Sequence, residues 1–382
     1  MRITYLKWGY SHDEAIINAF RNEGIYITDL TIPENLLIRG DTEGCNEQWL
    51  AEWKKFKSAI LSLKSDILFT INFFDFLSNF CLKEMIPYCC WVLQLPDFDL
   101  YHKAVYNPCN YIGICDSYLV EKMQKIGLSK VFFLPDAIDL LDGEENEPLY
   151  RELCFVESTP FVQLDQTGMS LYGKGYLDAF LHAQRVLYGA YILENGMISR
   201  VQREFEDTHL IPSSIRDEFH QLYLADEYLA PVCTRMQQEI LVQNFDTLIT
   251  IYSNGAFSNC DSVKYPYEEN EEKRRKIYSE KEFSLVLAPH ILHNGIPRTA
   301  LEVIAAGGFP LCGFQKDYAY FFKNNENIAF FSSISEFRRA IVKYGNDPDE
   351  RERIRRASYK LVKEQHTYKQ RIISMLNIWN SI

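Results

Sequence analysis

Short, continuously apolar segments that alternate with segments of helical periodicity constrain this chain most strongly. In the first 140 residues, apolar runs of four to six residues are separated by helix-like stretches such as Asp13–Asn22, where Ala15, Ile16, Ala19 and Phe20 recur on one face. Gly24 follows at a position typical of a helix end. The predicted strands are Ile3–Leu6, Ile25–Leu30, Asp66–Ile71, Tyr88–Leu93, Tyr111–Cys115 and Val131–Leu134. Strands that are apolar throughout are buried on both faces, so the pattern predicts a doubly wound parallel sheet.

A second region of the same kind follows a polar break. Residues 139–148 contain turn formers and a run of acids, and we place the domain boundary there. Strands are predicted at Leu153–Val156, Thr247–Tyr252, Leu285–Ala288 and Phe309–Cys312, with a strongly helical segment over about 175–245. The expected domains are 1–140, 141–366 and a C-terminal helix over 367–382. Because Ile372, Met375, Ile378 and Trp379 form an apolar face, we expect this helix to pack back on the N-terminal domain.

Composition excludes several classes of function. Acidic residues outnumber basic ones by 52 to 40, so a nucleic-acid-binding surface is not expected. The longest apolar run, near Asp66–Asp75, is about ten residues, which is too short to span a bilayer. The N-terminus lacks the apolar region of a signal peptide, and the ten cysteines have no zinc-binding spacing. We therefore expect a cytoplasmic protein with reduced cysteines and no resident metal.

The segment Leu285–Cys312 carries the clearest chemistry. A strand ends at Pro289, and a polar loop with His290, His293, Asn294 and Gly295 leads through Ile296 to a helix that starts near Pro297 and ends at Gly307-Gly308. A loop that feeds a helix N-terminus is an anion site, because backbone N–H groups and the helix dipole point at the ligand. Arg298 and Thr299 lie in the first turn, and Glu302, one turn further, suits a ribose diol.

Simpler interpretations of these residues stay open. Thr299-x-x-Glu302 also fits a capping box, although Pro297 argues for an earlier helix start. The two histidines can be loop residues without a role, and Arg298 can be an ordinary surface arginine.

The complete pattern resembles a known family. Gly295-Ile-Pro-Arg298, followed by Glu302-Val-Ile-Ala-Ala-Gly-Gly, is similar to the donor-binding domain of bacterial GT-B glycosyltransferases of the CgeB-like, spore-maturation type. Nearly the whole chain shares the resemblance, because Trp91–Pro96, Asp116–Val120 and Leu134–Asp139 look like that family's acceptor-side domain. It implies a GT-B-like α/β fold of two Rossmann-like domains, the second with a helical insertion, that face a cleft.

The resemblance implies metal-independent transfer of a sugar from a nucleotide-diphosphate sugar to a glycan, protein or cell-surface precursor. UDP-sugars are favoured and GDP-sugars come next, with no tightly bound cofactor. A donor pocket is expected from the strand ends at Ser158, Asn254 and His290 together with the Glu302 helix, and the turn Tyr252-Ser253-Asn254 would frame the base. Three positions depart from the family's pattern. Asn294 stands where related enzymes carry a glutamate, and Gln94 stands where they carry an acid. Glu157 lies where the family has a glycine-containing phosphate loop.

An inverting transfer needs a base within hydrogen-bonding reach of the acceptor hydroxyl. The candidates are His12, after the first strand, Asp97 or Asp99, just after Trp91–Pro96, and Asp75, after the third strand, with Asp97 favoured and His12 next. Arg298 would stabilise the leaving diphosphate. His12 can equally belong to the cap of the helix that begins at Asp13, and a retaining mechanism needs no such base.

Two other classes of function remain open. The three departures suit a non-catalytic sugar-nucleotide-binding protein on a decayed transferase scaffold, and a sugar-nucleotide epimerase shares the architecture. We expect no transmembrane segment, with peripheral contact to a membrane left open. The sequence names neither the sugar, the acceptor nor the stereochemical outcome.

Overall fold

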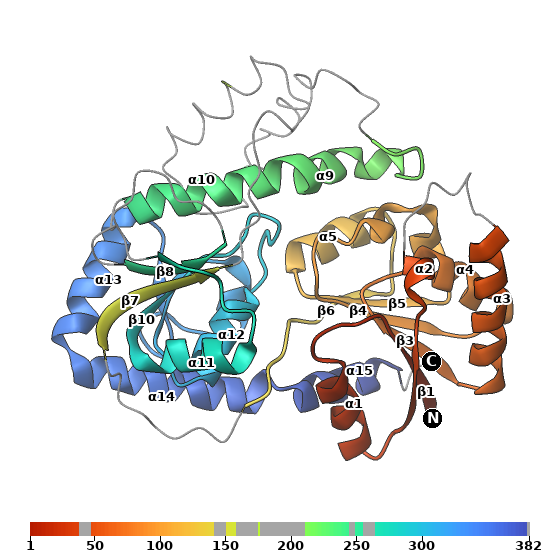
Figure 1. The fold of residues 1–382 in the computed structure, drawn as a ribbon, viewed down its shortest axis with the longest axis horizontal. Coiled ribbons are helices and arrows are strands. Elements are labelled where there is room, and N and C mark those ends of the chain that lie inside the picture. The colour runs from red at the N-terminus through yellow and green to blue at the C-terminus, as the bar shows by residue number, and fades with distance from the viewer. Residues whose placement is uncertain are drawn as a thin grey trace. The chain divides into compact units, whose positions relative to one another are not determined.

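The computed structural model describes residues 1–37, 47–140, 150–157, 175, 211–243, 249–254 and 264–379. The chain divides into two compact units, each built on one sheet (Figure 1). The first comprises residues 1–115, 122–134 and 368–382, and the second comprises residues 116–121 and 135–367.

The first unit contains a six-stranded sheet in the order β2-β1-β3-β4-β5-β6. Every strand pair is parallel. Strands β3 and β4 are buried along their whole length, as expected for a sheet covered on both faces. The strands are β1 (Arg2–Lys7), β2 (Tyr26–Thr31), β3 (Ile67–Ile71), β4 (Tyr88–Val92), β5 (Asn110–Ile114) and β6 (Val131–Phe133).

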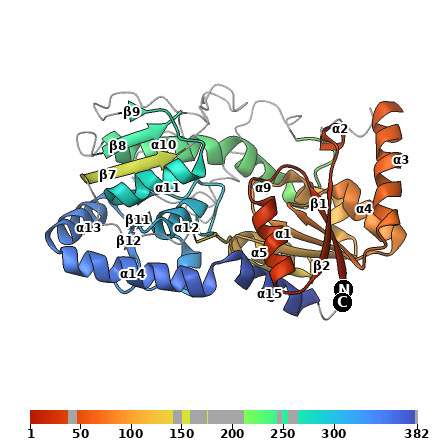
Figure 2. The same cartoon turned by 60° about the horizontal axis from the view of Figure 1, so that its bottom comes forward.

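The C-terminal helix belongs to this first unit. Helix α15 (Tyr368–Trp379) lies beside α1 (Asp13–Asn22), as both ribbon views show (Figures 1 and 2). Trp379 is buried, and its ring stacks on Phe20 with 6.0 Å between centroids. The other helices of this unit are α2 (Glu34–Leu37), α3 (Glu47–Ser62), α4 (Asp75–Glu84), the short η2 (Phe98–Tyr101) and η3 (Lys103–Tyr106), and part of α5 (Ser117–Lys125).

The second unit contains a parallel sheet in the order β12-β11-β10-β7-β8-β9. Counted along the chain, this is the order 6-5-4-1-2-3 of a Rossmann fold, and its topological switch point lies between β7 and β10. The strands are β7 (Tyr150–Glu157), β8 (Ile249–Ser253), β9 (Lys264–Tyr265), β10 (Lys281–Val286), β11 (Pro310–Gly313) and β12 (Ala329–Phe331).

Apolar clusters cover both faces of this sheet. Alternate residues of β7 serve the two clusters, Leu153 and Phe155 in one, Cys154 and Val156 in the other. Helices α13 (Ile334–Asn346) and α14 (Pro348–Gln365) contribute to the first cluster, and α12 (Arg298–Ala305) to the second. Helices α9 (His220–Leu224), α10 (Ala230–Gln243) and α11 (Glu271–Glu280), with η6 (Asp217–Phe219), η7 (Ala225–Leu229) and η8 (Lys316–Tyr320), complete the described part of the unit.

The predicted fold class is confirmed, and most element boundaries agree within one to three residues of those expected. The strands β9 and β12 and the helix α11 were not predicted. Helix α11 was not predicted because most of its ten residues are charged or polar, so its sequence has no apolar stripe. Most of the predicted helical segment 175–245, and the acidic part of the predicted boundary, lie outside the described residues.

Candidate functional site

The carboxyl edge of the second sheet gathers the candidate donor residues. Because β10, β7 and β8 are adjacent and parallel, their carboxyl ends lie at one edge. Asn254 follows β8, and the loop with His290 follows β10 beside the switch point. Ser158, the candidate after β7, lies outside the described residues. Ligands of open α/β sheets bind at such an edge.

Helix α12 starts without a side-chain cap. Its N-cap residue is Pro297, and Arg298 and Thr299 are its first two residues. The capping-box interpretation of Glu302 is therefore wrong, because Thr299 lies inside the helix. Ile296 is buried in the apolar cluster beneath the helix and anchors the loop. The uncapped first turn is suited to hold an anion.

Two glycines end α12 as the sequence predicts. Gly307 adopts a left-handed φ of 74°, which favours glycine. A Cβ on Gly308 would lie 2.8 Å from the carbonyl oxygen of Tyr278, so only glycine lets α12 approach α11 this closely.

Glu302 lies between two arginines. Its carboxylate accepts hydrogen bonds from Arg274 at 3.3 and 3.4 Å, and it pairs with Nε of Arg298 at 3.3 Å. The Glu302 side chain is 7% exposed and that of Arg274 is 11% exposed, so this is a nearly buried ionic group. Arg274 comes from α11 and was missed because that helix was missed.

Arg298 contacts the first residues of the segment 135–367, within the second unit. Its Nη1 atom donates to Oδ1 of Asp136 at 3.2 Å and to the carbonyl oxygen of Ala137 at 2.9 Å. The side chain is 22% exposed. Arg298 is thus no isolated surface residue, because it belongs to a balanced group of two arginines and two carboxylates.

The loop before α12 is held by Asp116, which is completely buried. Its Oδ2 atom accepts the backbone N–H groups of Asn294 at 2.9 Å and Gly295 at 3.0 Å. The Asn294 amide also donates to the Ser117 hydroxyl at 3.0 Å. Two N–H groups of the loop therefore already bind a carboxylate of the chain. An anion at this loop would have to bind the N–H groups of the first turn of α12 instead.

Asp317 supports the same loop. Its carboxylate accepts the backbone N–H of Ser117 at 3.0 Å and pairs with the Ser117 hydroxyl, while its own N–H donates to the Asn294 carbonyl. Burial raises the pKa of Asp317 to about 6, against the hydrogen bonds from Ser117.

This pKa predicts a pH dependence of stability. Because the folded pKa exceeds the unfolded value, the contribution is complete below about pH 4 and is lost as the pH rises to about 6. We expect the free energy of unfolding of the wild type to fall by about 3 kcal/mol over this window relative to Asp317→Asn. Urea denaturation of both proteins between pH 4 and 7 measures the difference, and parallel profiles would contradict the assignment.

The two loop histidines are both buried. Burial and the neighbouring His293 lower the pKa of His290 to about 3, so its imidazole is neutral at neutral pH. The backbone N–H of His290 donates to the Thr234 hydroxyl at 2.7 Å. Nε2 of His293 lies 3.5 Å from Asp226, and its ring contacts that of Tyr118. These contacts explain the histidines as parts of the loop's packing.

The turn after β8 carries an aromatic pair. The rings of Tyr252 and Tyr265 stack with 5.1 Å between centroids. Asn254 is exposed, and its side-chain oxygen accepts the backbone N–H of Tyr267 at 3.1 Å. Ser253 ends the strand between them. The Asn254 contact connects this turn to the segment that leads into α11 and Arg274.

The two favoured candidate bases, Asp97 and His12, lie in the first unit. Asp97 is 3% exposed, and its carboxylate accepts the backbone N–H of Phe73 at 2.6 Å, which favours a structural role. His12 precedes α1, and its side chain does not cap the helix. Its ring lies between those of Tyr10 and Tyr368.

Comparison with known proteins agrees with this geometry. Residues 245–377, which include α11, α12 and β10, match the protein family described as glycosyl transferase-like. No curated protein matches the sequence.

Several solved structures share the fold of the complete chain. They include a glycosyltransferase from Rickettsia africae (11% identity, TM-score 0.53, covering 100% of this chain and 98% of that one). Sucrose-phosphate synthase from Thermosynechococcus elongatus is similar (10%, 0.52, 100% and 98%). So is HepE of Anabaena, solved with UDP and glucose (6%, 0.51, 100% of both chains). The protein thus has the GT-B fold of glycosyltransferases.

Among the described residues, no helix combines the length and the apolar character needed to cross a membrane. The described cysteines are free thiols, and burial raises the pKa of Cys89 and Cys90 well above the usual value. A structural role for these two residues accounts for this environment.

Proposed function

We propose that this protein transfers a glycosyl group from a nucleotide-diphosphate sugar to a glycan, protein or cell-surface precursor, as an enzyme of the CgeB-like type. The observation that carries the proposal is the position of α12. Its uncapped N-terminus, with Arg298 and Glu302, lies at the carboxyl edge of a Rossmann sheet, within the glycosyl transferase-like match. That edge is where such folds bind nucleotides.

Each part of the donor has a candidate partner. The first turn of α12 and Arg298 would hold the diphosphate, and Glu302 would accept hydrogen bonds from the ribose hydroxyls. The turn Tyr252–Asn254 would frame the base. UDP is favoured because HepE, which shares the fold, was solved with UDP and glucose.

The transfer step would use charges of the protein for the leaving diphosphate, without a divalent ion. An arginine and helix N–H groups that are already in place stabilise developing negative charge at little reorganisation cost. His12 is the proposed base for an inverting transfer, and Asp97 would hold the neighbouring loops. A retaining transfer would not need this base. A hexose is the favoured sugar.

A thermal-shift panel of UDP-, GDP-, dTDP- and CDP-sugars tests the proposal. We expect UDP-sugars to stabilise the protein most, by about 2.7 kcal/mol at 100 times the dissociation constant. The same sugars without a nucleotide are the control and should produce no shift. If no nucleotide sugar stabilises the protein, the proposal fails.

A specific observation keeps a non-catalytic binding protein as the second candidate. Arg298 and Arg274 are each paired with carboxylates of the chain, which leaves little net positive charge for a transition state. Slow hydrolysis of a bound donor in the absence of acceptor separates the candidates, because a transferase releases the nucleoside diphosphate and a binding protein returns the donor intact.

A further inference from the structure

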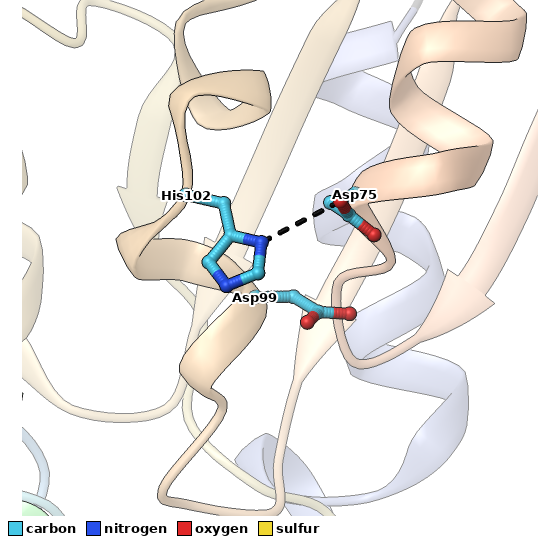
Figure 3. A group of neighbouring side chains, drawn as sticks. All are labelled: Asp75, Asp99 and His102. Atoms are coloured by element: carbon cyan, nitrogen blue, oxygen red, sulfur yellow. Dashed lines mark hydrogen bonds and ion pairs between the residues drawn. The ribbon is translucent and has the colours of Figure 1, made fainter. Parts of the chain in front are cut away.

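Three side chains in the first unit form a cluster that the donor site does not use. Asp75, Asp99 and His102 each offer one ligand atom, and these atoms all lie within 4.8 Å of one another (Figure 3). Nδ1 of His102 lies 3.5 Å from Oδ2 of Asp75. The cluster thus combines two carboxylates with an imidazole.

The cluster is built from two neighbouring strand ends. Asp75 is the first residue of α4, which follows β3, and Asp99 lies in η2, which follows β4. His102 stands between η2 and η3. Because β3 and β4 are adjacent and parallel, their carboxyl ends bring the three side chains to one edge of the first sheet.

Polar contacts hold these two loops together. Asn72, with a left-handed φ of 60°, accepts the backbone N–H groups of Leu93 and Gln94 and donates to the carbonyl of Gln94 at 2.7 Å. Asp97 adds the bond to Phe73 described above. The backbone that carries Asp75 is therefore held against the backbone that leads to Asp99.

A second set of contacts fixes the other side of the cluster. Ser78 of α4 donates to the carbonyl of Ala104 in η3 at 3.0 Å, and Asn110 donates to the same carbonyl at 2.9 Å. These bonds hold α4 against the short helix that follows His102. Metal-binding side chains depend on such support for their orientation.

We propose that Asp75, Asp99 and His102 bind a divalent transition-metal ion, with Zn²⁺ as the best fit. Zinc takes histidine nitrogen and aspartate oxygen at about 2.0–2.2 Å in tetrahedral geometry, so its ligand atoms lie about 3.3–3.6 Å apart. The 3.5 Å between His102 and Asp75 already matches this spacing, and the Asp99 oxygen, which lies within 4.8 Å of both, would move closer by up to about 1.3 Å. The imidazole nitrogen favours zinc over calcium or magnesium, which prefer oxygen ligands.

Charge and exposure agree with this ligand. A divalent ion balances the two carboxylates, of which Asp99 is only 7% exposed. The side chains of Asp75 and His102 are 26% and 17% exposed, which gives the ion a path from solvent. Three protein ligands leave a coordination position for water or for an oxygen of a bound molecule. The residues of this site belong to the first unit, whereas the proposed diphosphate-binding residues of α12 belong to the second.

Calorimetric titration of the full chain with Zn²⁺ tests the proposal. We expect one ion per chain in the wild type, and binding at least about 100-fold weaker in His102→Ala and Asp75→Asn. His220→Asn is the matched control, because His220 also lies 3.5 Å from an aspartate but belongs to no group of three ligands among the described residues. The control should bind zinc as the wild type does.

Co²⁺ identifies the ligands independently. The wild type should develop visible d–d absorption without a thiolate charge-transfer band, and His102→Ala should lose it. Thermal melts without metal should coincide for the wild type and His102→Ala, which shows that the variant folds. Cys109 is a free, half-buried thiol that contacts the Ser78 carbonyl of α4, so it is the alternative ligand to exclude. Zinc binding that survives both ligand substitutions, or that disappears in Cys109→Ser, would overturn the proposal, as would the absence of saturable binding by the wild type.

Discussion

An Arg298→Ala variant is expected to bind a nucleoside diphosphate about 10–150-fold more weakly than the wild type. The loss corresponds to one charge-assisted contact with the diphosphate, about 1.5–3 kcal/mol. Affinity for the nucleoside should change little, because the ribose and base make no contact with the guanidinium in the proposed pose. Calorimetric titration with nucleoside and nucleoside diphosphate measures both quantities.

Asp136→Asn is the matched control for this variant. It removes the charge of the carboxylate that accepts from Arg298 at 3.2 Å but keeps the arginine and the shape of the site. If Arg298 serves the ligand, this control should bind the nucleoside diphosphate as tightly as the wild type or more tightly. If Arg298 serves only the ion pair, both variants should lose stability while their affinities remain unchanged.

Glu302→Gln gives a complementary pattern at the same helix. If Glu302 accepts from the ribose, the nucleoside and the nucleoside diphosphate should lose affinity alike. Because Glu302 is buried between Arg274 and Arg298, we also expect the free energy of unfolding to fall by about 1–3 kcal/mol. A change in the free energy of unfolding therefore does not test the contact between Glu302 and the ribose. The affinity for the nucleoside does.

Trp379→Ala is expected to lower the free energy of unfolding by about 3–5 kcal/mol. Trp379 is 2% exposed, and its ring contacts those of Phe20 and Phe69. The truncation opens a cavity between α15, α1 and β3, which the surrounding rings cannot fill without rearrangement. Urea denaturation, followed by far-UV circular dichroism, measures the change.

Asn377→Ala provides the control on the same helix. Asn377 is exposed, so this substitution should change the free energy of unfolding by less than about 0.5 kcal/mol. Equal stability of Trp379→Ala and Asn377→Ala would show that α15 contributes little to the folding of the first unit.

The loop between β10 and α12 shows what can be predicted from the sequence and what cannot. The loop, the helix that starts near Pro297 and the glycines that end it were predicted from residues that are neighbours in the chain. The partners of that helix were not, because Arg274 comes from a charged helix without an apolar stripe, and Asp116 lies 178 residues before Asn294. Sequence patterns predict the local backbone, whereas ion pairs depend on how distant parts of the chain pack together.

The candidate bases show the same limit. Asp97 was predicted as a base because it follows a strand, yet its carboxylate accepts the backbone N–H of Phe73 in a neighbouring loop. His102, five residues later, was not predicted as a site residue, because Asp75 and Asp99 become its neighbours only across adjacent strands.

The sequence by itself determined that this chain forms parallel α/β sheets, because apolar strand segments and helical periodicity are properties of contiguous residues. It also located the loop and helix at the carboxyl end of β10. The tertiary structure alone decided which charged side chains meet, placing Glu302 between two arginines and His102 beside two carboxylates. The physical reason is that a parallel sheet brings strand ends together from distant parts of the chain, and the hydrogen bonds between the loops then set the direction of each side chain.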